Sequence, residues 1–149
     1  MGADLYIEMV FEPSYRRWKN RFEEAVARRD ACAEGTPEYK LWWLRAEACS
    51  DRMYSAGYFR DSYNPSSLLW QFGLSWWKDV IPMLDERNNL TVAQAETLLE
   101  MLDERGPVFE KKLAQFSPDE QQDFRDRATE LQMFLQMAIK LDSPIHCSL

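Results

Sequence analysis

The sequence is poor in the residues that most often carry catalysis. It contains one histidine, His146, and five scattered glycines in 149 residues. A general base must be held within hydrogen-bond reach of its nucleophile, whereas His146 lies near the C-terminal end and is predicted to be an exposed residue of a loose tail. The glycines form no phosphate-binding loop. These shortages disfavour nucleophilic triads and P-loop chemistry.

Cysteine is scarce as well. Cys32, Cys49 and Cys147 are too few and too scattered for a disulfide framework, which indicates a reducing compartment. His146 and Cys147 are adjacent and point apart, and no CxxC or HxxxH pair with the spacing of zinc ligands occurs elsewhere. The twelve residues from Asp85 to Glu96 have the length of a calcium loop, but Arg87 occupies a ligand position and Leu90 stands where the turn needs glycine. We therefore expect no metal, no cofactor and a cytoplasmic location.

Positive charge is in deficit: 18 basic residues face 25 acidic ones, which gives a net charge of −7. Nucleic-acid binding requires a cationic surface, so we expect no nucleic-acid partner. An acidic surface suits a basic protein partner, although it also simply favours solubility. The longest uncharged stretch, residues 62–77, is too short and too polar to cross a bilayer, and the first residues lack a secretory signal. We expect no membrane association.

What the sequence does contain is helical periodicity with clear helix boundaries. Ser14 is predicted to cap a first helix, and Thr36-Pro37 a second one that forms an antiparallel hairpin with it. Capping boxes begin at Thr91 and Ser117. Residues 68–81 are apolar on every side of a helix, which is typical of a buried central helix. The predicted fold is an all-α single domain over 1–149, a bundle of five or six helices around this central helix.

The two ends of the chain are predicted to lie outside the bundle. Residues 1–13 are rich in strand formers and are predicted to form an extended arm that ends at Pro13. A lone strand needs a partner edge, so the arm either pairs with an unrecognised strand or packs across a homodimer. Residues 143–149 are predicted to be a loose tail.

Aromatic residues are abundant, with 20 in total, and the block 54–79 combines many of them with polar groups. Such a block can form a ligand pocket or an interface anchor. In a structural alternative, Arg60 and Asp61 pair locally and Asn64 stabilises the turn before Pro65. The candidate binding residues are Tyr58, Arg60, Asp61, Tyr63 and Asn64.

The opening Met-Gly-Ala-Asp-Leu-Tyr-Ile, and the block 57–67 followed by Leu-Ser-Trp-Trp at 74–77, resemble small bacterial proteins of unknown function. The resemblance covers the N-terminal half. It implies a bacterial or phage cytosol and no particular activity, so it assigns no residue a role.

The predicted function is a non-enzymatic protein-interaction domain, either an adaptor or an acidic, immunity-type inhibitor of a basic protein. The alternative is a small-molecule binder or enzyme that uses the block 54–79. Convergence of Arg60, Asp61 and Asn64 on an open cavity would favour the alternative. Pairing of these residues inside the protein would favour the interaction domain.

Overall fold

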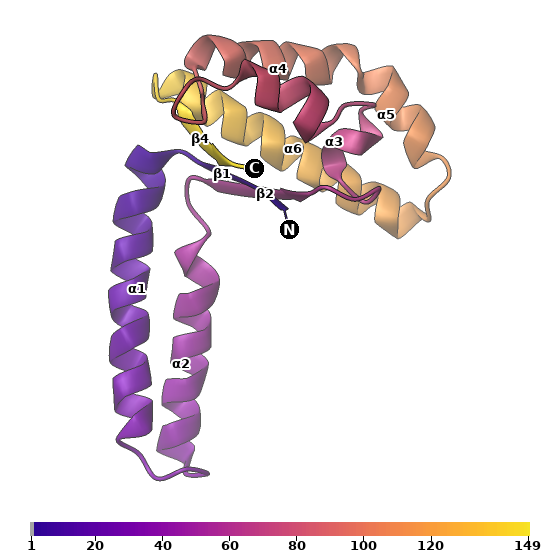
Figure 1. Ribbon diagram of the computed structural model, residues 1–149. Coiled ribbons are helices and arrows are strands. Elements are labelled where there is room, and N and C mark those ends of the chain that lie inside the picture. The colour runs from indigo at the N-terminus through magenta and orange to yellow at the C-terminus, as the bar shows by residue number, and fades with distance from the viewer. Residues whose placement is uncertain (1) are drawn as a thin grey trace. The chain divides into compact units, whose positions relative to one another are not determined.

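In the computed structural model, which describes residues 2–149, the chain divides into two compact units (Figure 1). The hairpin unit is Glu8–Tyr58, and the sheet unit combines residues 2–7 with Phe59–Leu149. The chain thus leaves the sheet unit after its first strand and returns to it at Phe59. That residues 1–149 form one domain stays a prediction, since compactness alone does not measure independent stability.

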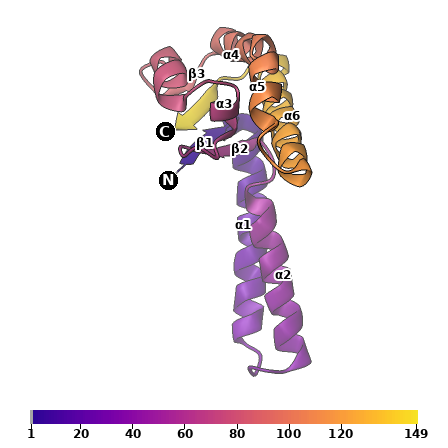
Figure 2. The same ribbon diagram turned by 90° about the vertical axis from the view of Figure 1, so that its right-hand side faces the viewer.

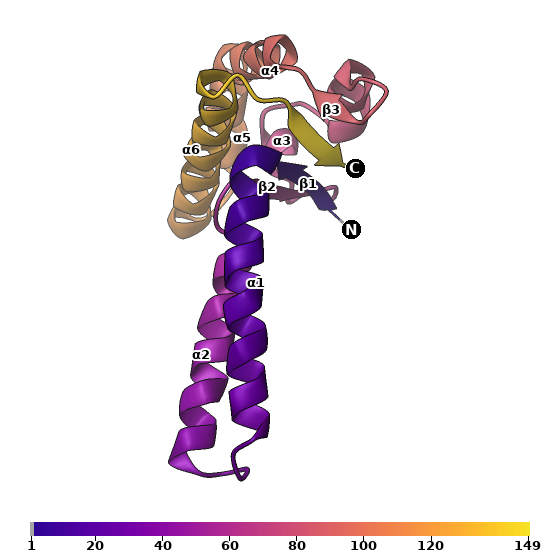
Figure 3. The ribbon, with the colours of Figure 1, turned by 90° about the vertical axis from the view of Figure 1, so that its left-hand side faces the viewer.

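The hairpin unit consists of two antiparallel helices, α1 (Glu8–Asp30) and α2 (Pro37–Met53), which lie side by side in Figures 1 and 3. The turn between them contains Gly35 at φ 84°, a left-handed conformation that glycine adopts without steric cost. The Thr36 hydroxyl accepts a hydrogen bond from the Tyr39 N–H at 3.2 Å, and Pro37 is the first helical residue. The predicted cap and the predicted hairpin are both confirmed.

The first helix begins earlier than the sequence predicts. Residue 1 of the predicted arm lies outside the described residues, but residues 8–13 are already helical, so the arm 1–13 is too long and the cap at Ser14 is wrong. Pro13 lies inside the helix and cannot donate a backbone hydrogen bond, at a cost of about 3 kcal/mol. Burial of Phe11 against the rings of Tyr15 and Tyr54, at centroid distances of 5.2 and 5.9 Å, offsets this cost.

The sheet unit is built on a four-stranded sheet in the order β2–β1–β4–β3, seen in Figure 2. Strands β1 and β4 are antiparallel, with Asp4 opposite Ser148 and Tyr6 opposite His146, and β3 pairs antiparallel with β4. Ala3 and Leu5 in β1, and Ile7 directly after it, are fully buried. The strands are β1 (Gly2–Tyr6), β2 (Tyr58–Ser62), β3 (Asn89–Leu90) and β4 (Ile145–Ser148).

This sheet corrects the prediction of an all-α fold: the chain is mostly helical, but it is not a pure helical bundle. The tail 143–149 is not loose, because β4 lies between two strands and buries Ile145 and Cys147. His146 is half-buried, with Nδ1 3.0 Å from the Asn89 Oδ1, and is not an exposed tail residue. The partners of β4 lie far away in sequence, where local patterns carry no information.

The position of β1 bears on the predicted homodimer. This strand has a neighbour on each side within its own chain, β2 on one and β4 on the other. Its hydrogen-bonding edges are therefore occupied. A homodimer through residues 1–13 stays a prediction, and within β1 it could use only the faces of the strand.

The longest helices of the sheet unit are α4 (Val92–Glu104), α5 (Gly106–Leu113) and α6 (Pro118–Lys140). Both predicted capping boxes are confirmed, since Thr91 and Gln94 exchange hydrogen bonds at the start of α4, as do Ser117 and Glu120 at the start of α6. Helix α6 packs against α4. Within residues 2–149, no helix has both the length and the apolar character needed to span a lipid bilayer.

The predicted central helix 68–81 is wrong. Helix α3 covers only Leu68–Gln71, and a π-helical turn at Trp76–Val80 and a 3₁₀ turn at Ile81–Met83 follow. Gly73, at φ 70°, ends α3 in the manner of a glycine stop. Trp76 is buried, but Trp70 and Trp77 are 52% and 58% exposed. The apolar residues on every side therefore belong to a segment that changes direction.

Candidate functional site

The five predicted site residues lie along β2 and the turn that follows it. Side chains on a strand alternate between its two faces, and Asp61 is buried while Arg60 is exposed. Tyr63 and Asn64 follow in the turn before α3. Tyr58 belongs to the hairpin unit, and the other four belong to the sheet unit.

Asp61 is a buried carboxylate, 2% exposed, at the centre of a hydrogen-bond network. Two of its donors are backbone N–H groups in the first turn of α3, which have no partner within a helix. Its six donors, at 2.7–3.1 Å, are the N–H groups of Ser62, Leu68 and Leu69, the Ser67 hydroxyl, the Trp76 indole and the Arg127 guanidinium. Asp61 therefore fixes α3, the π-helical turn and α6 to β2.

The surroundings of Asp61 also set its protonation state. Burial by itself raises the pKa of a carboxylate, because it penalises the charged form. The hydrogen bonds from Leu68, Trp76, Ser67 and Leu69 outweigh burial and lower the pKa of Asp61 below its ordinary value. The carboxylate is thus charged and fully engaged at neutral pH. A general acid or base working near neutrality requires a shift in the opposite direction.

The two other polar candidates also have partners inside the chain. The Arg60 Nε lies 3.6 Å from a carboxylate oxygen of Asp4 on β1. The Asn64 Oδ1 accepts hydrogen bonds from the Ser66 N–H and the Ser62 hydroxyl, both at 3.0 Å, which stabilises the turn. The local Arg60–Asp61 pair of the structural alternative is replaced by two longer-range pairs, Arg60 with Asp4 and Arg127 with Asp61.

The two tyrosines lie in separate aromatic clusters. The Tyr58 ring is 5.1 Å from that of Tyr54 in the hairpin unit. The Tyr63 ring is 5.4 Å from that of Trp77, and its buried hydroxyl has no hydrogen-bond partner among the described residues. Burial raises the pKa of Tyr63, so the hydroxyl keeps its proton. The structure therefore brings together Asp61 and its donors, and it places the two tyrosines in separate clusters. Binding by these residues stays a prediction.

A different constellation lies on the hairpin unit, where the pattern Trp-x₂-Arg-x₆-Arg occurs once in each helix. In α1 it consists of Trp18, Arg21 and Arg28, and in α2 of Trp42, Arg45 and Arg52. Seven residues make about two helical turns, so the two arginines of each helix lie on the same side. Because the helices are antiparallel, each tryptophan meets the last arginine of the other helix.

Each tryptophan has two guanidinium groups at cation–π distance. The Trp18 ring centroid lies 5.0 Å from the Arg21 Cζ in its own helix and 4.8 Å from the Arg52 Cζ across the hairpin. The Trp42 ring centroid lies 4.6 Å from the Arg45 Cζ and 4.8 Å from the Arg28 Cζ. Exchanging the two helices maps one set onto the other, so the hairpin unit has a local two-fold arrangement.

These six side chains line a groove of about 480 Å³ on the hairpin unit, which we call the arginine–tryptophan groove. Its four arginines are exposed and its two indoles are half-buried. Its only carboxylate is that of Glu24, which pairs with Arg28 at 3.1 Å. The groove therefore carries excess positive charge on a chain whose net charge is −7. Its remaining lining residues are Ala25, Ala48 and Cys49.

The arrangement suits recognition of anionic groups. A guanidinium is planar, stacks on aromatic rings and keeps its N–H donors at its edge, where they match a carboxylate or phosphate. Contact with an indole restricts the long arginine side chain before any ligand arrives, which lowers the entropy lost on binding. The groove can therefore present the N–H donors of four positioned guanidinium groups to an acidic surface.

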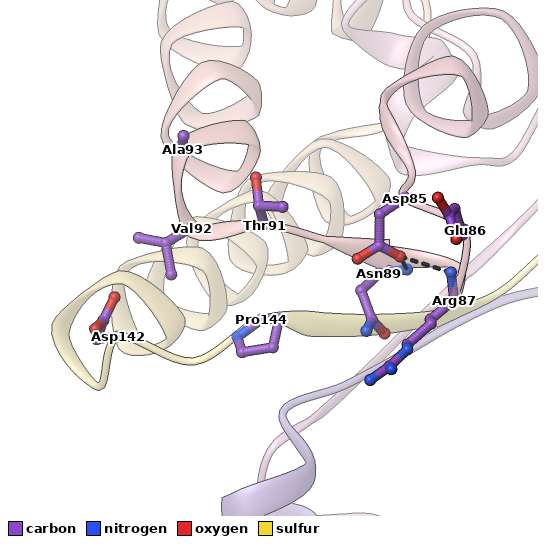
Figure 4. A pocket seen from close by; sticks show the side chains of 9 residues that line it. All are labelled: Asp85, Glu86, Arg87, Asn89, Thr91, Val92, Ala93, Asp142 and Pro144. Carbon is purple, nitrogen blue, oxygen red and sulfur yellow. Dashed lines mark hydrogen bonds between the residues drawn. The ribbon is translucent and has the colours of Figure 1, made fainter.

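The sheet unit contains a wider hollow of about 740 Å³ beside β3 and the start of α4, shown in Figure 4. Its lining includes the first part of the segment that has the length of a calcium loop. One oxygen of Asp85 accepts hydrogen bonds from the N–H groups of Arg87 and Asn89 at 2.9 Å, which stabilises the turn. Among residues 2–149, no three His, Cys, Asp or Glu side chains form a group that could hold a metal ion.

Comparisons of the chain with protein-family models, curated proteins and solved structures gave no match. The candidate site therefore rests on its geometry. Sequence reasoning missed it because the two copies of Trp-x₂-Arg-x₆-Arg share their spacing but not the residues in between. Comparing the two predicted helices of the hairpin with each other at fixed spacing would have revealed it.

Proposed function

We propose that this chain is a non-enzymatic protein-interaction domain that binds its partner through the hairpin unit. The observation that carries the proposal is the arginine–tryptophan groove. Tryptophan and arginine are the residues most enriched among those that dominate binding energy at protein interfaces. Here two tryptophans and four arginines line a single groove on two helices.

Exposed apolar residues beside the groove support the same function. Leu41 and Leu44 on α2 are 46% and 49% exposed. Leu41 precedes Arg45 by four residues and Leu44 precedes Ala48 by four, so both leucines lie along the groove side of α2. A partner would therefore meet apolar contact area next to the guanidinium groups, the mixture that gives interfaces their affinity.

The pairing of Asp61 and Asn64 within the sheet unit favours this function over the small-molecule alternative, because the polar groups of both residues already have hydrogen-bond partners inside the chain. The charge distribution also bears on the partner. The hairpin unit has nine basic and nine acidic residues, so the whole net charge of −7 lies outside it. A basic partner would be attracted to the sheet unit, and that partner stays a prediction.

The test is affinity capture from a lysate of the source organism, quantified by mass spectrometry. The variant Leu41→Ser/Leu44→Ser removes the apolar contacts beside the groove. The matched control, Met133→Ser/Met137→Ser, changes two exposed apolar residues of α6. We expect one or more proteins to be enriched by the wild type and the control, and about tenfold less by the leucine variant, which corresponds to about 1.4 kcal/mol. Equal enrichment by all three proteins, or none, would contradict the proposal, provided that thermal melts show each variant to be folded.

A further inference from the structure

Most of the positive charge of the groove is not neutralised by ion pairs, although the hairpin unit as a whole has equal numbers of basic and acidic residues. Within the described part of the chain, Arg21, Arg45 and Arg52 form no ion pair, and Arg28 shares its only one with Glu24. Shielding the indoles from water needs only the aliphatic parts of long side chains. Four like charges in one groove repel each other, so they favour a partner that brings carboxylates.

The spacing of these charges is regular. Arg21 and Arg28 are seven residues apart on α1, as are Arg45 and Arg52 on α2, which is about 10.5 Å along each helix. The contacts with the two indoles sort the guanidinium groups into two pairs, one at Trp18 and one at Trp42. A helix that lies along the groove with carboxylates seven residues apart would place one carboxylate at each pair.

The chain itself contains such a helix. Helix α4 has four acidic residues and no basic residue. Glu96, Glu100 and Asp103 follow one another at intervals of four and three residues, so they form one stripe whose ends are seven residues apart. All three are exposed, and none forms an ion pair with another described residue. By contrast, the acidic residues of α6 alternate with Arg125 and Arg127, which already pair elsewhere.

We propose that the arginine–tryptophan groove binds the acidic stripe of α4 from a second copy of this chain. The proposal rests on the proposed function, because it names the partner of the same groove. If each copy inserts its α4 into the groove of the other, the contact is reciprocal and closes a two-fold dimer. The match in spacing and in sign favours a second copy over a nucleic acid, which needs a longer cationic surface and would be repelled by the acidic sheet unit.

Charge reversal tests this contact, with sedimentation velocity as the readout. We expect the wild type to form a dimer of twice the 17.6 kDa chain mass as concentration rises. The groove variant Arg21→Glu/Arg45→Glu and the stripe variant Glu96→Arg/Asp103→Arg should each be monomeric, because like charges then face each other. A 1:1 mixture of the two variants should restore the dimer, since each groove then faces a stripe of opposite charge.

Matched controls separate this contact from general charge effects. Arg17→Glu/Lys40→Glu makes the same change of charge at exposed positions of α1 and α2 outside the groove lining, and it should leave the dimer intact. The stripe variant alters only exposed side chains of the sheet unit, so it still tests the contact if the groove variant fails to fold.

Three results in sedimentation would overturn the proposal: a wild type that stays monomeric, a dimer that survives both charge reversals, or a mixture that stays monomeric. A monomeric wild type whose cellular partner is lost in Leu41→Ser/Leu44→Ser would reject the second copy and leave the interaction function standing. Binding of a labelled single-stranded DNA by the wild type, but not by the groove variant, would assign the groove to nucleic acid and also overturn the proposal.

Discussion

The hairpin unit and the sheet unit are stabilised in different ways. Of the 27 buried apolar residues among residues 2–149, only four lie in the hairpin unit: Phe11, Ala25, Ala46 and Met53. All buried polar residues of the described chain, Asp61 among them, lie in the sheet unit. The sheet unit therefore has a conventional core, whereas the hairpin unit leaves much of its side-chain surface exposed.

This difference indicates where the chain can change its surface with the smallest loss of stability. Substitution of a buried residue creates a cavity or an unpaired polar group, whereas most exposed positions tolerate change within about 0.5 kcal/mol. The hairpin unit is rich in exposed positions, and it carries the arginine–tryptophan groove. We therefore expect substitutions in the sheet unit to affect mainly stability, and those in the hairpin unit to affect mainly binding.

The largest expected effect concerns the buried polar network of the sheet unit. Asp61→Ala should lower the free energy of unfolding by about 3–5 kcal/mol, because it leaves the Arg127 charge and several buried donors without an acceptor. The same substitution at the exposed Asp51 of the hairpin unit should change it by less than about 0.5 kcal/mol. Urea denaturation measures both. Similar losses of stability for the two variants would show that the sheet unit does not depend more strongly on polar contacts than the hairpin unit does.

The next effect concerns the apolar core of the sheet unit. Trp76→Ala should cost about 3–5 kcal/mol, since the ring is fully buried and its indole donates to Asp61 at 2.8 Å. Trp43→Ala in the hairpin unit, where the side chain is 42% exposed, should cost less than about 1 kcal/mol. Trp70→Ala should also be mild, because this side chain is 52% exposed, whereas a buried central helix over 68–81 would predict a severe loss. A severe loss in Trp43→Ala would show that the hairpin unit depends on apolar contacts as the sheet unit does.

The smallest expected effect concerns acid. Because the folded state lowers the pKa of Asp61, the charged carboxylate stabilises the fold fully above the ordinary aspartate pKa of about 3.9, and this contribution is lost as pH falls below that value. Thermal melts across this range should therefore fall more steeply for the wild type than for Asp61→Asn, whose side chain does not titrate. Parallel curves would show that other carboxylates govern acid unfolding.

The parts of the fold that the sequence predicts correctly are those fixed by neighbouring residues. The caps at Thr36, Thr91 and Ser117 depend on residues within one helical turn, and all three are present. The hairpin follows from a short turn between two periodic segments. In each case the deciding contacts lie within a few positions along the chain.

The parts that the sequence does not predict depend on distant residues. Strand β4 reads as a loose tail because its apolar face is explained only by its neighbours β1 and β3. Gly73 divides an apolar stretch that periodicity alone treats as one helix. Composition made Asp61 a candidate binding residue, which stays a prediction, but only the six donors around it show its role in the fold. The groove required a comparison between two helices.

The pairing of Asp4 with Ser148 has a consequence for biosynthesis. A ribosome adds roughly 5–20 residues per second, so β1 waits on the order of 10 s before its neighbour β4 has been made. Until then the apolar side chains of Ala3, Leu5 and Ile7 lack part of their cover. The contacts between α1 and α2 are local and can form on the nascent chain. We therefore expect the newly made sheet unit, rather than the hairpin unit, to be the segment that engages chaperones.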